Sequence, residues 1–179
     1  NDMGLINSRH IPNFMPQDGQ MYITLTSVKA TADEINDTKL EELPDTPRVY
    51  KGMVTGDFPE TSYPTSLKMT LKAGAQVVFI KNDPERRWYN GTIARVVELE
   101  EEGIWAEDEK GDKFFVEPDL WDNVRYKYDE KEHKVVEEVR GTFKQRPLRL
   151  AWAITIHKSQ GLTFDKVVID AGKAFTYGQ

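Results

Sequence analysis

The sequence predicts an α/β domain that is interrupted by a small β-barrel insert, and three observations lead to this prediction. Residues 21–43 have the pattern of a strand, a short turn and a capped helix, which is the elementary unit of α/β domains. Residues 76–144 instead carry several short segments separated by turn residues, as small barrels do. The apolar run at 167–169 then predicts a buried parallel strand, so the α/β pattern returns.

The first predicted elements are the strand and the helix of this unit. Residues 21–27 alternate apolar and polar side chains and are rich in β-formers, which indicates a strand. Thr31 and Glu34 match a capping box, in which each side chain accepts the backbone amide of the other residue. We therefore expect a helix from Thr31 to about Leu43, where Pro44 stops it. Four apolar side chains are expected to face inward: Ala32, Ile35, Leu40 and Leu43.

The chain divides into three predicted parts. Residues 1–66 form the first part of the α/β domain, with an irregular lead-in, one more short strand at 48–55 and a linker. Residues 67–146 form the barrel insert, and residues 147–179 return to the α/β domain. The strands of the insert are expected at 76–81, 91–99, 104–107, 113–116, 121–128 and 134–144.

The last predicted strand of the insert has its own pattern. Val135, Val139 and Phe143 stand at odd positions and share one face of a strand, which Glu137 and Gly141 interrupt. We therefore expect this strand to be long and half-buried.

The composition limits the classes of function. The formal net charge is −6, which argues against bulk electrostatic binding of nucleic acid. Zero cysteines exclude disulfides, thiolate zinc sites and cysteine nucleophiles, and three scattered histidines argue against a histidine-only metal site. No apolar run approaches the ~18 residues of a membrane span, so we expect a soluble, cytoplasmic protein. One local strip is basic without an acidic residue and contains Arg140, Lys144, Arg146, Arg149 and Lys158.

A phosphate-binding loop is not evident in the sequence. Such a loop reads Gly-x-x-x-x-Gly-Lys-[Ser/Thr], so that backbone amides wrap the phosphates and the lysine neutralises them. The nearest string, Gly172-Lys173-Ala174, lacks the Ser/Thr, and Val167 stands where the first glycine belongs. We therefore expect that the chain is not a self-sufficient nucleotide hydrolase of this type.

The most informative segment is 151–165, where donor-rich side chains lie between apolar anchors before a buried strand. We expect a short helix over 151–160 that Gly161 ends in a left-handed conformation. Two interpretations stay open on residue chemistry alone: a solvated helix with a cap glycine, or a set of phosphate contacts that position a nucleic-acid backbone. The candidate phosphate donors are Thr155, His157, Lys158 and Ser159.

This segment resembles motif V of superfamily 1 helicases, in the form found in RecD-like and PIF-type 5′→3′ DNA helicases. The resemblance implies that 151–165 lies in the second RecA-like domain, a P-loop NTPase-type fold, between single-stranded DNA and the ATP cleft. Gln160 and Gly161 would then lie towards the nucleotide γ-phosphate. The residues that the resemblance places on the DNA side are Thr155, His157, Lys158 and Ser159.

Two further segments are similar to the same family. Residues 23–36 resemble the start of the second RecA-like domain, which implies DNA contacts at Thr26 and Ser27, although Lys29 stands where the family has asparagine. Residues 71–92 resemble the SH3-like barrel that is inserted in this family. Two interpretations stay open for Arg140, Lys144, Arg146 and Arg149, which lead from this barrel to motif V: they line the DNA channel, or they are ordinary surface charge.

The resemblance implies a C-terminal fragment of an ATP-dependent 5′→3′ DNA helicase that acts in DNA repair or recombination. Its partners would be single-stranded DNA and the remainder of the parent helicase. ATP and Mg²⁺ would be bound mostly by a domain outside this chain, so we expect the chain alone to be inactive. A different class of function also stays open, a non-enzymatic SH3-like module that binds a peptide or protein partner through Trp88, Tyr89 and Trp105. A third possibility is a helicase domain that serves a larger nuclease or relaxase.

Overall fold

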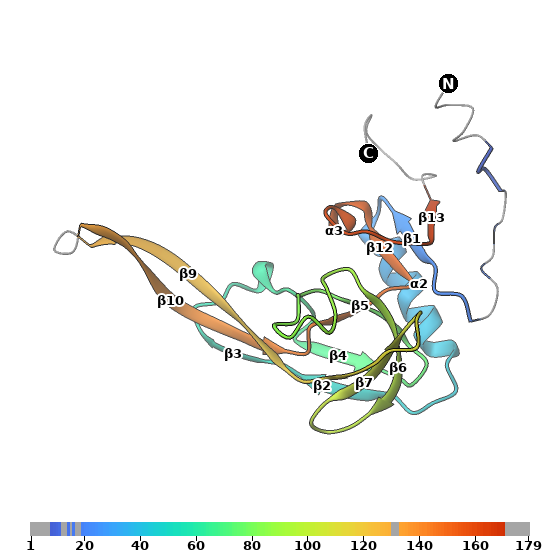
Figure 1. The fold of residues 1–179 in the computed structure, drawn as a ribbon, viewed down its shortest axis with the longest axis horizontal. Helices are drawn as coiled ribbons and strands as arrows, with labels where there is room; N and C mark the ends of the chain where they lie inside the picture. Colours follow the sequence, from blue (N-terminus) through green and yellow to red (C-terminus); the bar gives the residue numbers. More distant parts are fainter. Residues whose placement is uncertain (1–7, 12–13, 15, 17–18, 130–132, 171–179) are drawn as a thin grey trace.

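The computed structural model describes residues 8–11, 14, 16, 19–129 and 133–170 of the chain (Figure 1). A three-stranded parallel sheet stands at one end of the molecule, in the order β12-β1-β13. Its strands are β1 (Ile23–Thr26), β12 (Ala153–Thr155) and β13 (Val167–Asp170), and helix α2 (Lys29–Glu42) packs against β1 and β12. The predicted α/β class is confirmed by this arrangement, because its strands are parallel and a helix follows β1.

Helix α2 begins earlier than the sequence predicts, so the capping box at Thr31 is wrong. The first helical residue is Lys29, and the extended N-cap residue Val28 makes no side-chain cap. Ala32, Asn36 and Leu40 form the buried face at a spacing of four residues. Packing of the face that begins with Ala32 favours a helix that already starts at Lys29, just after β1. This packing outweighs the local cap that Thr31 could provide.

The remaining strands are antiparallel and form three small sheets. Their orders are β11-β5-β6-β7-β8, β3-β10-β9 and β2-β4. Among the described strands, β8 and β11 are the edges of the largest sheet, so the predicted small barrel is not confirmed. The strands are β2 (Arg48–Lys51), β3 (Met53–Gly56), β4 (Lys68–Leu71), β5 (Gln76–Phe79), β6 (Ile93–Leu99), β7 (Ile104–Asp108), β8 (Lys113–Val116), β9 (Asp119–Asp129), β10 (Lys134–Gln145) and β11 (Leu148–Leu150), with a 3-10 turn at Glu60–Ser62.

Strand β5 joins the two parts of the molecule because both of its faces are buried. Val77 and Phe79 pack into the core of the large antiparallel sheet, where Trp88 stacks on Phe79 at 4.6 Å between ring centroids. Val78 packs on the opposite side, in the cluster that contains Ile23 of the parallel sheet. The antiparallel part therefore lies directly against the α/β part.

The β9–β10 hairpin projects far from the body of the molecule (Figure 1). The sequence predicted a half-buried last strand, but Val135 and Val139 are 63% and 54% exposed. Burial begins at Gly141, because only the segment from Gly141 to Lys144 pairs with β3. The prediction is therefore right for the end of β10 that carries Phe143 and wrong for the projecting half.

The predicted helix over 151–160 is wrong in its first half. Ala153–Thr155 forms strand β12, and only Ile156–Ser159 forms the one-turn helix α3. Pairing with β1 decides this, because Ile154 and Thr155 are register partners of Leu25 and Thr26. Gly161 has φ +78, as expected for a residue that ends a helix in the left-handed region.

Two other expectations concern the C-terminal part of the chain. Strand β13 is parallel as predicted, but it is not buried, because it is an edge strand and Ile169 is largely exposed. The Gly172-Lys173-Ala174 string lies outside the described residues. In the part of the chain that is described, no helix combines the length and apolar character that a membrane crossing requires.

Candidate nucleic-acid interface

The carboxyl ends of β1 and β12 lie side by side, since parallel strands end at the same edge of a sheet. Thr26 and Thr155 are register partners there. Thr26 is fully buried, and its Oγ1 accepts a long hydrogen bond of 3.4 Å from the Val28 amide. Ser27 is also buried, and its Oγ has no hydrogen-bond partner among the described residues. Thr155 borders a groove, so this edge of the sheet leads into an open site.

The groove has a volume of about 790 Å³ and lies between α2, the chain around 60–70 and the β11–α3 segment. Three segments distant in sequence thus form one site. Its cationic side chains are Lys29, Lys68, Arg149 and Lys158, and its carboxylates are Asp33, Asp37 and Glu60. Its hydroxyl side chains are Tyr63, Thr65, Ser66, Thr70 and Thr155.

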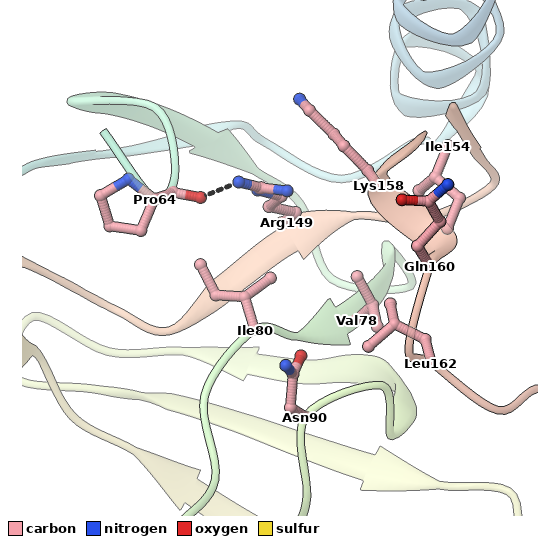
Figure 2. A pocket seen from close by; sticks show the side chains of 9 residues that line it. All are labelled: Pro64, Val78, Ile80, Asn90, Arg149, Ile154, Lys158, Gln160 and Leu162. Atoms are coloured by element: carbon pink, nitrogen blue, oxygen red, sulfur yellow. Dashed lines mark hydrogen bonds between the residues drawn. The ribbon is translucent and has the colours of Figure 1, made fainter. Parts of the chain in front are cut away.

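Lys158, Arg149 and Lys29 concentrate positive charge in one part of this groove. Partial burial lowers the pKa of Lys158, the nearby cations Arg149 and Lys29 lower it further, and Asp33 opposes the shift. Burial also lowers the pKa of Arg149, which donates a hydrogen bond to the Pro64 carbonyl (Figure 2). A bound anion would relieve the repulsion among these cations, so the groove favours an anionic ligand such as a phosphate.

Lys29 is a groove residue that the sequence alone placed in doubt. It is the first residue of α2 and pairs with Asp33 one turn later, at 2.5 Å between Nζ and Oδ2. The resemblance to helicases implies an asparagine at this position, so it assigned no role to a lysine. The sequence does not show that Lys29 lies near Lys158, because the pairing of β1 with β12 brings these two residues together.

The structure brings together only part of the predicted DNA-side set. Thr155, Lys158 and Arg149 border the groove. His157 is exposed on α3 and borders neither this groove nor the cavity shown in Figure 2. Ser159 Oγ donates to the Ile156 carbonyl at 2.7 Å, within its own helix.

The two residues predicted to face the nucleotide are also placed. Gln160 and Gly161 are exposed, and Gln160 borders the smaller cavity together with Lys158. No group of three or more histidine or carboxylate side chains in the described residues could hold a metal ion.

The basic strip does not act as one surface. Arg146 is buried, donates to the Glu101 and Glu102 carbonyls at 2.8 and 3.2 Å, and lies 4.2 Å from the ring of Tyr50. Its predicted place along a DNA channel is wrong, because its guanidinium fastens the β6–β7 turn. Arg140 pairs with Asp57 beside β3. Lys144 is exposed on β10, and only Arg149 and Lys158 of this strip border the groove.

Asn36 is a site residue that sequence reasoning missed. Its Nδ2 donates to the Ala153 carbonyl at 2.8 Å, and its Oδ1 accepts from the Ala153 amide at 3.0 Å. The only signal in the sequence is a polar residue one turn from Ala32 and Leu40, on the apolar face of a helix.

The aromatic side chains proposed for a protein partner lie in different environments. Trp88 is 5% exposed and belongs to the core, whereas Tyr89 is 58% exposed. Trp105 is half-buried and donates from Nε1 to Glu100 Oε1 at 2.9 Å. These three residues do not form one exposed aromatic patch.

Comparison with known proteins identifies the family of this chain. Residues 150–179 match the family described as the UvrD-like helicase C-terminal domain. The chain is 33% identical to the ATP-dependent DNA helicase Pif1 of Bdellovibrio bacteriovorus over 156 residues, which cover 84% of this chain and 34% of that protein. It thus spans about one third of the length of this relative.

Solved structures of Bacteroides Pif1 show the same fold. The complex with ADP-AlF4 superimposes with a TM-score of 0.82 and 38% identity, over 90% of this chain and 36% of that one. The structure bound to ssDNA gives a TM-score of 0.72 and 36% identity, over 90% and 37% of the two chains. The match covers both the parallel sheet with its motif V segment and the antiparallel part. This chain belongs to the Pif1-type superfamily 1 helicases and corresponds to part of their C-terminal region, within the second RecA-like domain.

Proposed function

We propose that the intact protein is an ATP-dependent DNA helicase that moves 5′→3′ along single-stranded DNA, and that this chain supplies DNA contacts and one wall of the nucleotide cleft. The observation that carries the proposal is the groove in which Lys29, Arg149, Lys158 and Thr155 meet. Relatives named as ATP-dependent DNA helicases support it, as do Bacteroides Pif1 structures with ssDNA and with ADP-AlF4.

The groove is suited to a DNA backbone. Lys29, Arg149 and Lys158 neutralise phosphates, and the Thr155 hydroxyl donates to a phosphate oxygen. Contacts of this kind hold a strand without reading its sequence, as a translocating protein requires. They release counterions, so affinity falls as the salt concentration rises.

The route from nucleotide to DNA is one helical turn long. Gln160 and Gly161 directly follow Lys158, and α3 joins them to Thr155. A displacement of Gln160 on the nucleotide side therefore moves Lys158 on the DNA side. ATP with Mg²⁺, bound mainly by other parts of the protein, supplies the free energy of phosphoryl transfer to water.

The antiparallel part is the SH3-like insert of the family in this proposal. The order β11-β5-β6-β7-β8 supports it, because the last strand lies beside the first strand of a four-strand meander. The pairing of β2 with β4 and of β3 with β10 favours an insert that begins near Arg48 rather than at residue 67. The burial of Trp88 speaks against a partner-binding module on this surface.

The test is binding of a labelled dT oligonucleotide by Lys158→Ala in the intact protein. Loss of one charged contact should weaken binding about 10- to 100-fold and lower the salt slope by about one. Lys113→Ala is the matched control, because Lys113 lies on β8 and borders neither cavity. Equal affinities for wild type and Lys158→Ala would show that DNA does not occupy this groove.

A further inference from the structure

A second, smaller cavity lies beside the groove, with a volume of about 180 Å³ (Figure 2). Polar and apolar side chains share its lining, and the apolar ones come from two parts of the molecule. Val78 and Ile80 belong to β5 and the residue that follows it, whereas Ile154 and Leu162 come from β12 and the turn after α3. A cavity of this size is well below the ~300–1,000 Å³ of pockets that enclose drug-sized ligands, and it suits a single nucleobase.

The loop before β6 closes one side of this cavity. Gly91 has φ +99, and a Cβ built there would lie 3.4 Å from Leu162 Cβ, so the loop rests on Leu162. The Asn90 amide donates to Asn82 Oδ1 at 2.8 Å, which holds the loop in place. Figure 2 shows the Asn90 side chain pointing towards the cavity.

Arg149 and Lys158 border both the small cavity and the large groove. A phosphate held by these two cations would therefore stand at the mouth of a partly apolar cavity large enough for one base. We propose that the small cavity receives one base of the single strand whose phosphates follow the groove. This inference rests on the proposed function, and it adds a base contact to the phosphate contacts.

The lining also determines what kind of base is accepted. Val78, Ile80 and Leu162 offer apolar contact to the faces of any base, which is sequence-tolerant. The Asn90 carboxamide carries both a donor and an acceptor, so it pairs with the edge of a purine or a pyrimidine. The cavity therefore requires that a base be present but discriminates little between bases.

The experiment uses the intact protein and the shortest dT oligonucleotide that binds with full affinity, so that one register dominates. Each position is replaced in turn by an abasic residue. One position should lower affinity about 5- to 100-fold, the range that stacking of one base supplies. Exchange of dT for dA or dC at that position should change affinity less than threefold.

Leu162→Trp fills the cavity and tests the assignment. It should weaken binding to dT and abolish the extra loss at the sensitive abasic position. Asn90→Ala, on an exposed loop, should reduce that loss without filling the cavity. Leu120→Trp is the control, because Leu120 is an exposed leucine on β9 that borders neither cavity. Thermal unfolding of each variant shows whether it is folded.

Two results would overturn the base site. If folded Leu162→Trp keeps both its affinity and the abasic penalty while Lys158→Ala weakens binding, the groove binds DNA but the cavity holds no base. If Lys158→Ala also binds normally, the groove proposal fails and the base site fails with it.

Discussion

The Asn36 side chain of α2 forms hydrogen bonds with both the carbonyl and the amide of Ala153 in β12, at 2.8 and 3.0 Å. In the described sheet β12 is an edge strand and pairs with β1 on one side only. On that side the Thr24 amide of β1 donates to the Trp152 carbonyl. The Asn36 carboxamide therefore takes the place of a neighbouring strand on the other side of Ala153. Because β12 runs directly into Thr155 and Lys158, this contact fixes the position of the groove wall relative to α2.

Asn36→Ala should lower the free energy of unfolding by about 2–4 kcal/mol, since it leaves two buried backbone groups of Ala153 without partners. Asn36→Asp keeps the acceptor but sets a buried carboxylate against the Ala153 carbonyl oxygen, so its loss should be at least as large. Urea unfolding measures both, and Asp37→Ala, at an exposed position of the same helix, is the control. A loss for Asn36→Ala no larger than that of the control would mean that the contact does not stabilise β12.

DNA affinity should fall at alkaline pH through Lys158. Partial burial and the neighbouring cations lower its pKa, so the free groove loses this charge at a lower pH than an isolated lysine would. Bound phosphate stabilises the charged form of Lys158. At a pH above the lowered pKa, DNA binding therefore requires uptake of a proton, and affinity falls as the pH rises. Lys158→Arg keeps its charge and should flatten this decline at alkaline pH. Parallel pH profiles of the two proteins would contradict this assignment.

The lowered pKa of Lys158 also predicts how the stability of the folded chain changes with pH. A lysine whose pKa is lower in the folded than in the unfolded chain binds fewer protons when folded, so its contribution to stability rises as pH approaches 10.5 from below. Lys158→Met should therefore raise the free energy of unfolding near neutral pH, by less than about 1 kcal/mol because the side chain is exposed and screened. Denaturant unfolding at pH 7 and 10 measures this, and a variant less stable than wild type at pH 7 would refute it.

Trp88 and Tyr89 should respond to substitution in opposite ways. Trp88→Ala removes a core ring that stacks on Phe79 and should cost about 3–5 kcal/mol of unfolding free energy. Tyr89→Ala should change stability by less than about 0.5 kcal/mol, because most of its surface is exposed. Thermal and denaturant unfolding of this neighbouring pair separate core from surface. Comparable losses for the two would show that the loop packs differently.

The 179-residue chain by itself should not hydrolyse ATP. Its described residues offer no metal-binding cluster, and its sequence has no phosphate-binding loop. A coupled phosphate-release assay with and without dT oligonucleotide is the measurement. A rate above background that survives further purification and is lost in Gln160→Ala would contradict the expectation.

Local chemistry was sufficient to predict several features of this protein. Alternation of side chains identified β1, and short segments between turn residues identified most strands of the antiparallel part. The order of residues in 151–165 identified the family. The left-handed conformation of Gly161 also follows from residue type alone. In each case the physical cause lies within a few neighbouring residues, so the sequence contains it.

Tertiary structure alone decided the rest. Ala153–Thr155 is a strand because β1 lies beside it, and α2 starts at Lys29 because a distant strand covers the Ala32–Asn36 face. Arg146 is buried by the Glu101–Glu102 carbonyls, whereas Arg149, three residues later, borders both cavities. Burial and the closeness of like charges depend on which distant segments of the chain pack together, and the local sequence does not specify that packing. The sequence thus determined the elements and the family, and the packing of 29–36 against 149–158 determined the site.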